Sequence, residues 1–247
     1  MLKLVFKKMF WCNYDNLFPN ILLSAVWFGL NLPVFVFLYL LIGSHVYSPW
    51  PYVIIWNFLW ISPLTAGLHH ATLPMVNSEP SEGRIKLFFK GIRKFGLRSL
   101  AIFLISTAFL LIVTRVFLFY ARDARGLPEF VRFIVAGIVV WVALYFVLME
   151  MNFYPVLAKQ DENIWKVFYK SFLLVLDRPG RQILFAVVVA GMFVIMTFSI
   201  FGLILFFSSF YALSSNIRTL VQLSRHNPKI VVEEENRTFR NLLKPWE

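Results

Sequence analysis

The chain has 247 residues, of which 59% are hydrophobic, 18% aromatic and only 15% charged. A soluble globular domain carries about 25% charged residues and at most about 50% apolar ones, so this composition excludes an ordinary soluble fold. The net charge is +11. The Lys and Arg residues lie between long apolar runs and form no nucleic-acid-binding motif. We therefore expect a membrane protein with no nucleic-acid partner.

Four apolar runs reach the length of about 20 residues that a membrane-spanning helix needs. A further run of 31 residues, from Ile183 to Leu213, carries no charge. It is long for one span and short for two, so its fold has to be decided from the charges around it. The four clear runs are Leu17–Ile42, Tyr52–Met75, Leu100–Tyr120 and Val131–Pro155.

The distribution of basic residues favours two spans in the last run. If the chain turns back near Thr197–Gly202, 20 of the 24 Lys and Arg residues lie on the side of the N-terminus, against 14 if the run is one helix. Basic residues concentrate on the cytoplasmic side of membrane proteins. The sequence thus predicts an all-α, polytopic transmembrane helix bundle with six spans and both termini cytoplasmic, the alternative being five spans. Residues 1–224 would form the membrane domain and residues 225–247 a cytoplasmic tail.

Two inner loops repeat one pattern 80 residues apart. Glu82–Lys90 and Glu162–Lys170 carry Glu, Lys, Phe and Lys at the same positions. Glu and Lys four residues apart support a short helix, and basic, aromatic helices lie in the membrane surface with their cations toward anionic lipid. We expect short amphipathic interfacial helices that anchor the bundle to the anionic inner leaflet or bind a protein partner in a transport complex. The candidate residues are Lys86, Phe88, Phe89, Lys90, Arg93, Lys94, Trp165, Lys166, Phe168 and Lys170.

Five polar residues are predicted to lie at one depth, near the inner face. Asp15 and Asn16 begin the first span, His69 and His70 end the second, and Glu150 falls late in the fourth. A cluster of His and carboxylate side chains there could relay protons or bind a cation. The alternative is that Glu150 reaches the interface and a histidine caps a carbonyl group, since adjacent histidines point about 100° apart on a helix. Metal-ligand spacing and soluble catalytic motifs are both absent from the sequence, so we expect no metal, no cofactor and no enzymatic activity.

Three segments in the first half of the chain resemble the YesL-like family of bacterial polytopic membrane proteins, whose molecular function is unknown. They are Asp15-Asn16-Leu17-Phe18 at the start of the first span, Ser62-Pro63-Leu64-Thr65-Ala66-Gly67-Leu68, and Phe88-Phe89-Lys90-Gly91-Ile92. The resemblance implies a bacterial cytoplasmic membrane location. It also implies a role beside carbohydrate uptake and breakdown, because genes of the family often accompany such systems.

Three functions remain open from the sequence. The first is a non-enzymatic accessory to a transport or carbohydrate-utilisation system, acting through the inner-face loops. The second is a small-solute transporter or channel, for which the sequence offers Asn31, Asn57, Ser106, Thr107, Thr197 and Ser199 near the midplane. The third is a lipid-active membrane enzyme built on the inner-face histidines and Glu150.

Overall fold

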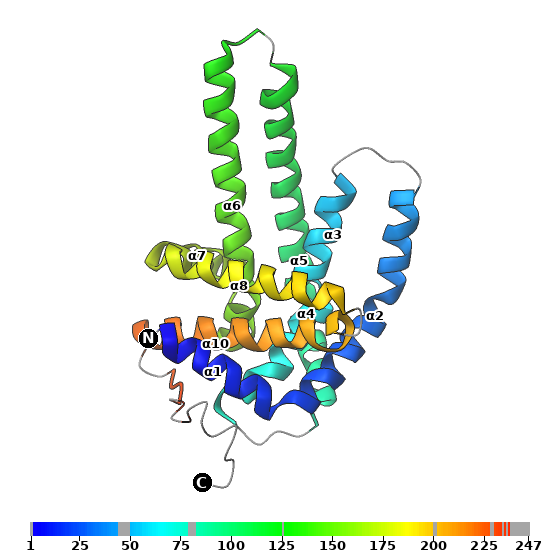
Figure 1. Ribbon diagram of the computed structural model, residues 1–247, viewed down its shortest axis with the longest axis vertical. Coiled ribbons are helices and arrows are strands. Elements are labelled where there is room, and N and C mark those ends of the chain that lie inside the picture. The colour runs from blue at the N-terminus through cyan, green and yellow to red at the C-terminus, as the bar shows by residue number, and fades with distance from the viewer. Residues whose placement is uncertain are drawn as a thin grey trace.

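The computed structural model describes residues 2–43, 50–78, 83–124, 126–199, 202–227, 230–233, 235 and 237. These residues form helices joined by turns and short extended segments (Figure 1). The α-helices are Leu2–Asp15 (α1), Leu17–Gly43 (α2), Trp50–Ile61 (α3), Pro63–Thr72 (α4), Arg84–Leu118 (α5), Glu129–Gln160 (α6), Ile164–Asp177 (α7), Pro179–Phe198 (α8) and Ser208–His226 (α10). Short 3-10 or π turns cover Leu73–Asn77 (η1), Phe119–Asp123 (η2) and Leu203–Phe207 (η3).

Two helical hairpins project from a layer of crosswise helices. The longer hairpin pairs α5 with α6, and the shorter one pairs α2 with α3 (Figure 1). Helices α1, α8 and α10 run crosswise to α5 and α6 near the lower end of α6, and the chain begins in this layer (Figure 1). We call this layer, formed by α1, α4, α7, α8, α10 and the first turns of α5, the base.

Within the described residues, five helices are long and apolar enough to cross a membrane: α2, α5, α6, α8 and the segment Ile204–His226. This confirms the predicted class of all-α membrane protein. In α5, α6 and α8, 17% or less of the apolar window is buried inside the protein, whereas in Ile204–His226 the share is 72%. The first three helices therefore offer their side chains to the surroundings, while α10 is packed within the protein.

The second predicted span, Tyr52–Met75, is divided into α3 and α4, so the expectation of one continuous helix was wrong. Pro63 follows the break, and a proline has no backbone N–H to continue the helix that precedes it. Ser62 caps the new helix, because its Oγ accepts a hydrogen bond from the backbone N–H of Thr65 at 3.3 Å. The break directs α4 away from α3 and into the base.

The last apolar run turns where the charge distribution predicted. Helix α8 ends at Phe198, the backbone of Ser199 is extended, and Gly202 is again helical, so the chain leaves α8 within the predicted turn Thr197–Gly202. The two arms nevertheless run crosswise to α5 and α6 (Figure 1). Their direction differs from that expected of two further spans parallel to the long hairpin.

The two amphipathic segments are built differently. The first is continuous with the third predicted span, because α5 runs unbroken from Arg84 to Leu118. The expectation of a separate short helix was therefore wrong. No proline interrupts this segment, and an isolated glycine lowers the stability of a helix by only about 1 kcal/mol. The second is a separate helix, α7. Asp161, in the left-handed region at φ 50°, ends α6, and the side chain of Asn163 caps the start of α7.

Helices α4 and α5 cross at two glycines. A Cβ added to Gly91 would lie 2.7 Å from His70 Cβ and 3.0 Å from Gly67 Cα. A Cβ added to Gly67 would lie 2.7 Å from the backbone oxygen of Phe88. Small residues allow this close approach of two helices in membrane proteins. The crossing fixes the basic end of α5 against the base.

Candidate functional site

Helix α10 carries a dense row of polar residues into the protein interior. Its buried positions include Ser209, Ser214, Ser215, Asn216 and Thr219. Polar groups that are buried need hydrogen-bond partners, because an unsatisfied group costs about 1–3 kcal/mol. In the described structure, these bonds run from α10 to the helices around it.

The first turns of α10 are bonded to α1 and α2. The Oγ of Ser209 donates to the backbone oxygen of Asn20 at 2.6 Å, and its backbone N–H donates to Ser24 Oγ at 3.1 Å. Asn13 Nδ2 lies 3.3 Å from Ser214 Oγ, to which it donates. The N-terminal helices are thus joined to α10 by side-chain hydrogen bonds as well as by apolar packing.

The centre of α10 is joined to α4 through Asn216. Its Oδ1 lies 3.0 Å from His69 Nδ1, and its Nδ2 donates to the backbone oxygen of His69 at 2.9 Å and to Thr72 Oγ1 at 3.0 Å. The His69 ring stacks on Tyr154 of α6 with a 5.5 Å centroid separation and meets the edge of Tyr211 at 6.0 Å. His69 is therefore fully engaged in interhelical packing.

The last turns of α10 are joined to α6 and α7. Arg218 Nη2 donates to the backbone oxygen of Met151 at 3.1 Å and to Asn152 Oδ1 at 2.9 Å. Gln222 Nε2 donates to the backbone oxygen of Leu174 at 2.7 Å and to Asp177 Oδ2 at 3.1 Å. Helix α10 is thus hydrogen-bonded to α1, α2, α4, α6 and α7. We call this set of interhelical bonds the α10 polar core.

The polar residues predicted at the start of the first span lie at the surface of the base. The carboxylate of Asp15 accepts two hydrogen bonds from Arg237 of the tail, at 2.9 Å and 2.6 Å. The Arg237 guanidinium also lies over the Trp11 ring, 4.5 Å from its centroid. Asn16 donates to the backbone oxygen of Cys12 at 2.8 Å. This part of the tail is therefore docked on α1.

The other three residues of the predicted cluster have different neighbours. His69 is bonded to α10 as described above. His70 is half-buried and meets the ring of Phe95 edge-on at 5.5 Å. Glu150 is 5% exposed and lies close enough to Tyr154 to interact with it electrostatically. Of the five predicted residues, His69 and Glu150 share Tyr154 as a neighbour, whereas the described contacts of Asp15, Asn16 and His70 are with other residues.

Helix α5 is joined by ion pairs to the turn between α6 and α7, just before the second repeat. Asp161 pairs with Lys94 at 2.9 Å and with Arg98 at 2.6 Å, both on α5. The hydrogen bonds from Lys94 and Arg98 lower the pKa of the Asp161 carboxyl. The part of α5 that follows the first repeat is thereby connected to the residue that ends α6, and the sequence pattern did not predict the contact through Arg98.

Glu162 makes the matching contacts on the second repeat. Its carboxylate pairs with Lys170 at 2.6 Å and with Lys166 at 3.5 Å. The hydrogen bond from Lys170 lowers the pKa of Glu162. These cations are engaged within the protein. The predicted cations Lys86, Lys90 and Arg93 are also exposed on α5.

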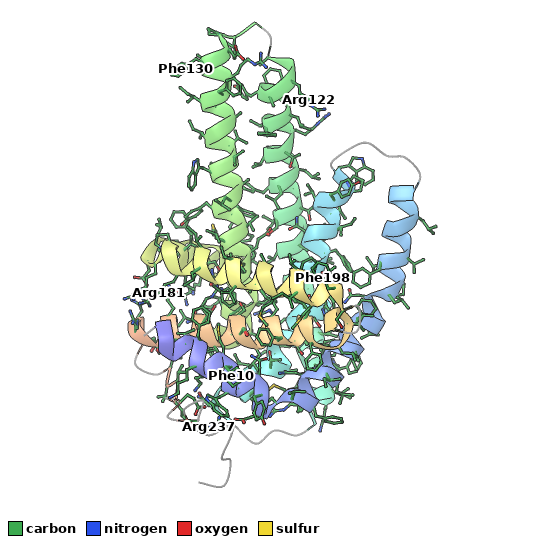
Figure 2. The ribbon with its side chains drawn as sticks, viewed as in Figure 1. Phe10, Arg122, Phe130, Arg181, Phe198 and Arg237 are labelled. Atoms are coloured by element: carbon green, nitrogen blue, oxygen red, sulfur yellow. The ribbon has the colours of Figure 1, made fainter. Side chains whose placement is uncertain are left out.

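The aromatic residues of the repeats divide between core and surface. Phe88 is fully buried and Phe168 partly buried, whereas Phe89 is 51% and Trp165 72% exposed. Figure 2 shows Phe130 and Arg122 at the far tip of the α5–α6 hairpin and Phe10 and Arg237 at the opposite end, in the base. The predicted inner-face residues therefore belong to the base and its edge.

The polar residues of α10 were missed in the sequence because they were counted as the weakly polar end of a span. The signal was present: Ser208–Gln222 holds a regular series of Ser, Asn, Thr, Gln and Arg beside strongly apolar sequence. Polar residues at that density favour an interior helix bonded to its neighbours rather than a lipid-facing one.

Within the ranges that the structure describes, no group of three or more His, Cys, Asp or Glu residues is placed to hold a metal ion. No family model, curated protein or solved structure matches this chain. The resemblance to the YesL-like family stays a prediction from the three sequence segments.

Proposed function

We propose that this chain is a non-enzymatic accessory protein of the bacterial cytoplasmic membrane, which binds a protein component of a transport or carbohydrate-utilisation system at the inner face. The observation that carries the proposal is an exposed basic and aromatic surface at the start of α5. Ile85, Phe89, Lys90 and Arg93 are exposed there on one side of the helix, and we call them the basic–aromatic face.

The composition of this face suits a protein contact. Aromatic residues and Arg are enriched in protein interfaces, Arg is common among the residues that contribute most to binding, and cations steer an acidic partner. Within the described part of the chain, no ion pair joins Lys90 or Arg93 to a carboxylate, whereas Lys94 is paired with Asp161. The two exposed cations are thus available to an anionic group on another molecule.

The proposal includes a placement in the membrane. The α2–α3 and α5–α6 hairpins cross the bilayer, and the base lies on the cytoplasmic side with both termini. This placement keeps the same 20 of the 24 Lys and Arg residues inside as six parallel spans would, because a hairpin that does not cross leaves the following tail on the same side. The crosswise course of α8 and α10 supports it (Figure 1).

Helices α7 and α8 fit the membrane surface in this placement. The buried side of α7 carries Val167, Ser171, Leu174 and Val175. Helix α7 also exposes apolar residues on the side away from the protein. A helix of this kind lies along the membrane interface with its exposed apolar residues in the lipid. The outward residues are Trp165, Tyr169, Phe172, Leu173 and Leu176 on α7, and Val187, Val194, Ile195 and Phe198 on α8.

The transporter alternative has weaker support. Asn31 donates to the backbone oxygen of Trp27, Asn57 to that of Val53, and Thr197 to that of Phe193. These donors are therefore bonded within their own helices. The side-chain oxygens of Asn31, Asn57, Ser106 and Thr107 are buried without a hydrogen-bond partner among the described residues. The enzyme alternative relies on His69, His70 and Glu150. His69 and Glu150 share Tyr154 as a neighbour, but the His69 ring is bonded to Asn216 and His70 contacts Phe95 instead.

Capture of partners from native membranes tests the proposal. We expect the double variant Lys90→Glu/Arg93→Glu to lose a bound transport component that the wild-type chain retains, as measured by quantitative mass spectrometry. Arg122, an exposed cation in η2 just beyond the opposite end of α5, gives the matched control Arg122→Glu, which should retain it. Recovery of the same partners at the same level with the double variant would refute the docking role of this face.

A further inference from the structure

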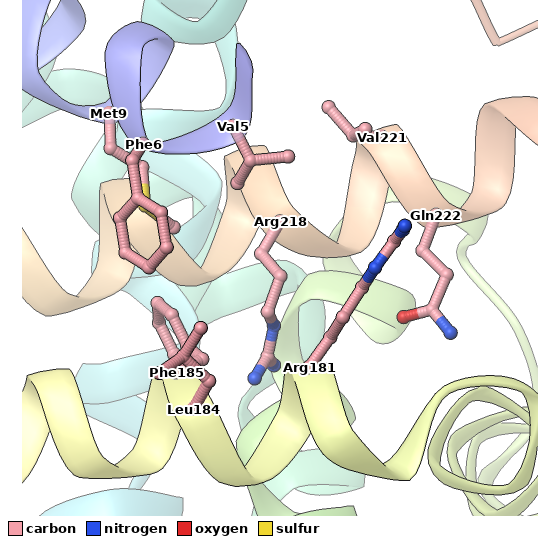
Figure 3. A pocket seen from close by; sticks show the side chains of 9 residues that line it. All are labelled: Val5, Phe6, Met9, Arg181, Leu184, Phe185, Arg218, Val221 and Gln222. Carbon is pink, nitrogen blue, oxygen red and sulfur yellow. The ribbon is translucent and has the colours of Figure 1, made fainter. Parts of the chain in front are cut away.

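A cavity of about 40 Å³ lies between α1, α8 and α10. It is partly open and has apolar walls with three polar side chains (Figure 3). Arg218 extends into the space from α10 and Arg181 from α8, and Gln222 lies beside them (Figure 3). The lining residues are Val5, Phe6, Met9, Arg181, Leu184, Phe185, Arg218, Val221 and Gln222.

Arg218 carries a buried charge that the described protein satisfies only in part. The side chain is 6% exposed, and its Nη2 is bonded to Met151 and Asn152 of α6. Its Nε and Nη1 are buried and have no hydrogen-bond partner among the described residues, and no described carboxylate forms an ion pair with it. The Phe185 ring lies 4.1 Å from the guanidinium, which offsets part of the cost of burying it. A buried cation of this kind favours an anionic ligand.

The surroundings add positive charge. Arg178 and Arg225 lie close enough to Arg181 to interact with it electrostatically. The nearby carboxylate, Asp177, is shared between Arg178 at 3.6 Å, His226 at 3.6 Å and Gln222 at 3.1 Å. One carboxylate therefore faces several cations, and the local excess of positive charge extends from the surface to Arg218.

We infer that this cavity binds one phosphate group, and that the group belongs to the headgroup of an anionic phospholipid. A guanidinium matches a phosphate because two N–H groups donate to two oxygens in parallel. One water-sized probe occupies about 10–15 Å³, so 40 Å³ accepts roughly three oxygen-sized positions. The partly open cavity therefore has room for the two non-bridging oxygens of a phosphodiester, with Arg218 in its lining.

The walls of the cavity point to a lipid as the source of the phosphate. Leu184 is 39% exposed and Val187, one turn further along α8, is 61% exposed. An acyl chain lying on this apolar side of α8 would extend from the phosphate in the cavity. Basic pockets at the inner membrane face are a known form of lipid headgroup site. This inference is independent of the partner that binds the basic–aromatic face.

The test measures the thermal unfolding midpoint of the full-length chain in detergent with three additions: phosphatidylglycerol, phosphatidylcholine and inorganic phosphate. We expect phosphatidylglycerol to raise the midpoint in a saturable way, because a ligand that binds only the folded state stabilises it. Phosphatidylcholine, with a cationic group beside its phosphate, should raise it much less. An equal rise with inorganic phosphate would overturn the lipid source, and no rise with any of the three would overturn the site.

Two variants connect the effect to the cavity. Arg181→Gln should weaken the apparent affinity for phosphatidylglycerol about tenfold and Arg218→Gln about a hundredfold, as expected when one partner of a charge-assisted contact is removed. Arg122→Gln is the control, because Arg122 is an exposed cation in η2, at the far tip of the α5–α6 hairpin and outside the cavity. The α6 contacts described for Arg218 do not involve Arg181, so the Arg181 variant tests the site even if Arg218→Gln does not fold. Equal affinities for Arg181→Gln and Arg122→Gln would refute the assignment.

Discussion

His69 of α4 and Asn216 of α10 are joined by two hydrogen bonds: His69 Nδ1 lies 3.0 Å from Asn216 Oδ1, and Asn216 Nδ2 donates to the His69 backbone oxygen at 2.9 Å. The pair lies at the centre of the α10 polar core, and both residues are at most 1% exposed. It connects the segment after the Ser62 break to the helix that organises the base.

Replacement of Asn216 tests the energetic importance of this pair. Asn216→Leu keeps the approximate volume but leaves His69 Nδ1 without its partner, so we expect a loss of about 2 kcal/mol of unfolding free energy. The measurement is the thermal or denaturant unfolding midpoint in detergent. Asn57→Leu is the control, because Asn57 is also buried but donates to Val53 of its own helix. Equal losses for the two variants would contradict the assigned role of the pair.

The glycine crossing of α4 and α5 makes a second prediction. A methyl group at Gly91 would meet His70 Cβ at 2.7 Å and Gly67 Cα at 3.0 Å, which forces the helices apart. We expect Gly91→Ala to lower the unfolding midpoint clearly, with a loss of about 1–3 kcal/mol. Gly137→Ala on α6 meets nothing within 4 Å and should leave stability unchanged or slightly raised. A tolerated Gly91→Ala would show that the crossing is looser than described.

The ion pairs of Asp161 and Glu162 predict a pH dependence. The pKa values of Asp161 and Glu162 are lowered in the folded chain, so these carboxylates favour folding at pH values above their ordinary range. This contribution is lost as the pH falls through about 4 and below, where the unfolded chain binds protons first. We expect the unfolding midpoint of wild type to fall between pH 7 and pH 3.5 by more than that of Asp161→Asn/Glu162→Gln. Parallel pH profiles would count against these pairs.

Cys12 gives a prediction about reactivity. The side chain is 7% exposed, its Sγ donates to the backbone oxygen of Met75 at 3.0 Å, and burial raises its pKa to about 11. Because the thiolate is the reactive form, the folded chain should resist N-ethylmaleimide at pH 7 and react once unfolded in dodecyl sulfate. Mass spectrometry of the alkylated chain measures this. Stoichiometric labelling of the folded chain would place Cys12 at the surface.

Much of the fold follows from the sequence, for physical reasons that particular residues make clear. A run without charge and with about 20 apolar residues has few stable alternatives to a helix in lipid, which is why α2, α5 and α6 were predicted near their observed positions. The turn after Phe198 followed from charge balance. The direction of α8 and α10 did not, because charge balance is the same for a crossing hairpin and one that lies at the inner face.

The candidate site was less predictable. Depth along a span placed His69 and Glu150 at one level, but depth does not specify which face of a helix a residue occupies. The side that the His69 ring faces is set by its hydrogen bond with Asn216, which lies 147 positions away along the chain. Such long-range pairs depend on how helices are rotated against each other, which a single sequence does not encode locally. The same holds for Arg98, which reaches Asp161 across 63 positions.

Side-specific labelling of the turn after α8 tests the central claim, that the base with α8 and α10 lies at the inner face. Ser199→Cys is made in the chain that retains Cys12, and intact cells are treated with a membrane-impermeant maleimide. Gly126→Cys, between α5 and α6, is the outer control and Val231→Cys the inner one. We predict labelling of Gly126→Cys alone in intact cells, with Ser199→Cys protected like Val231→Cys. Labelling of Ser199→Cys from outside to the level of Gly126→Cys would establish two further spans and contradict the account.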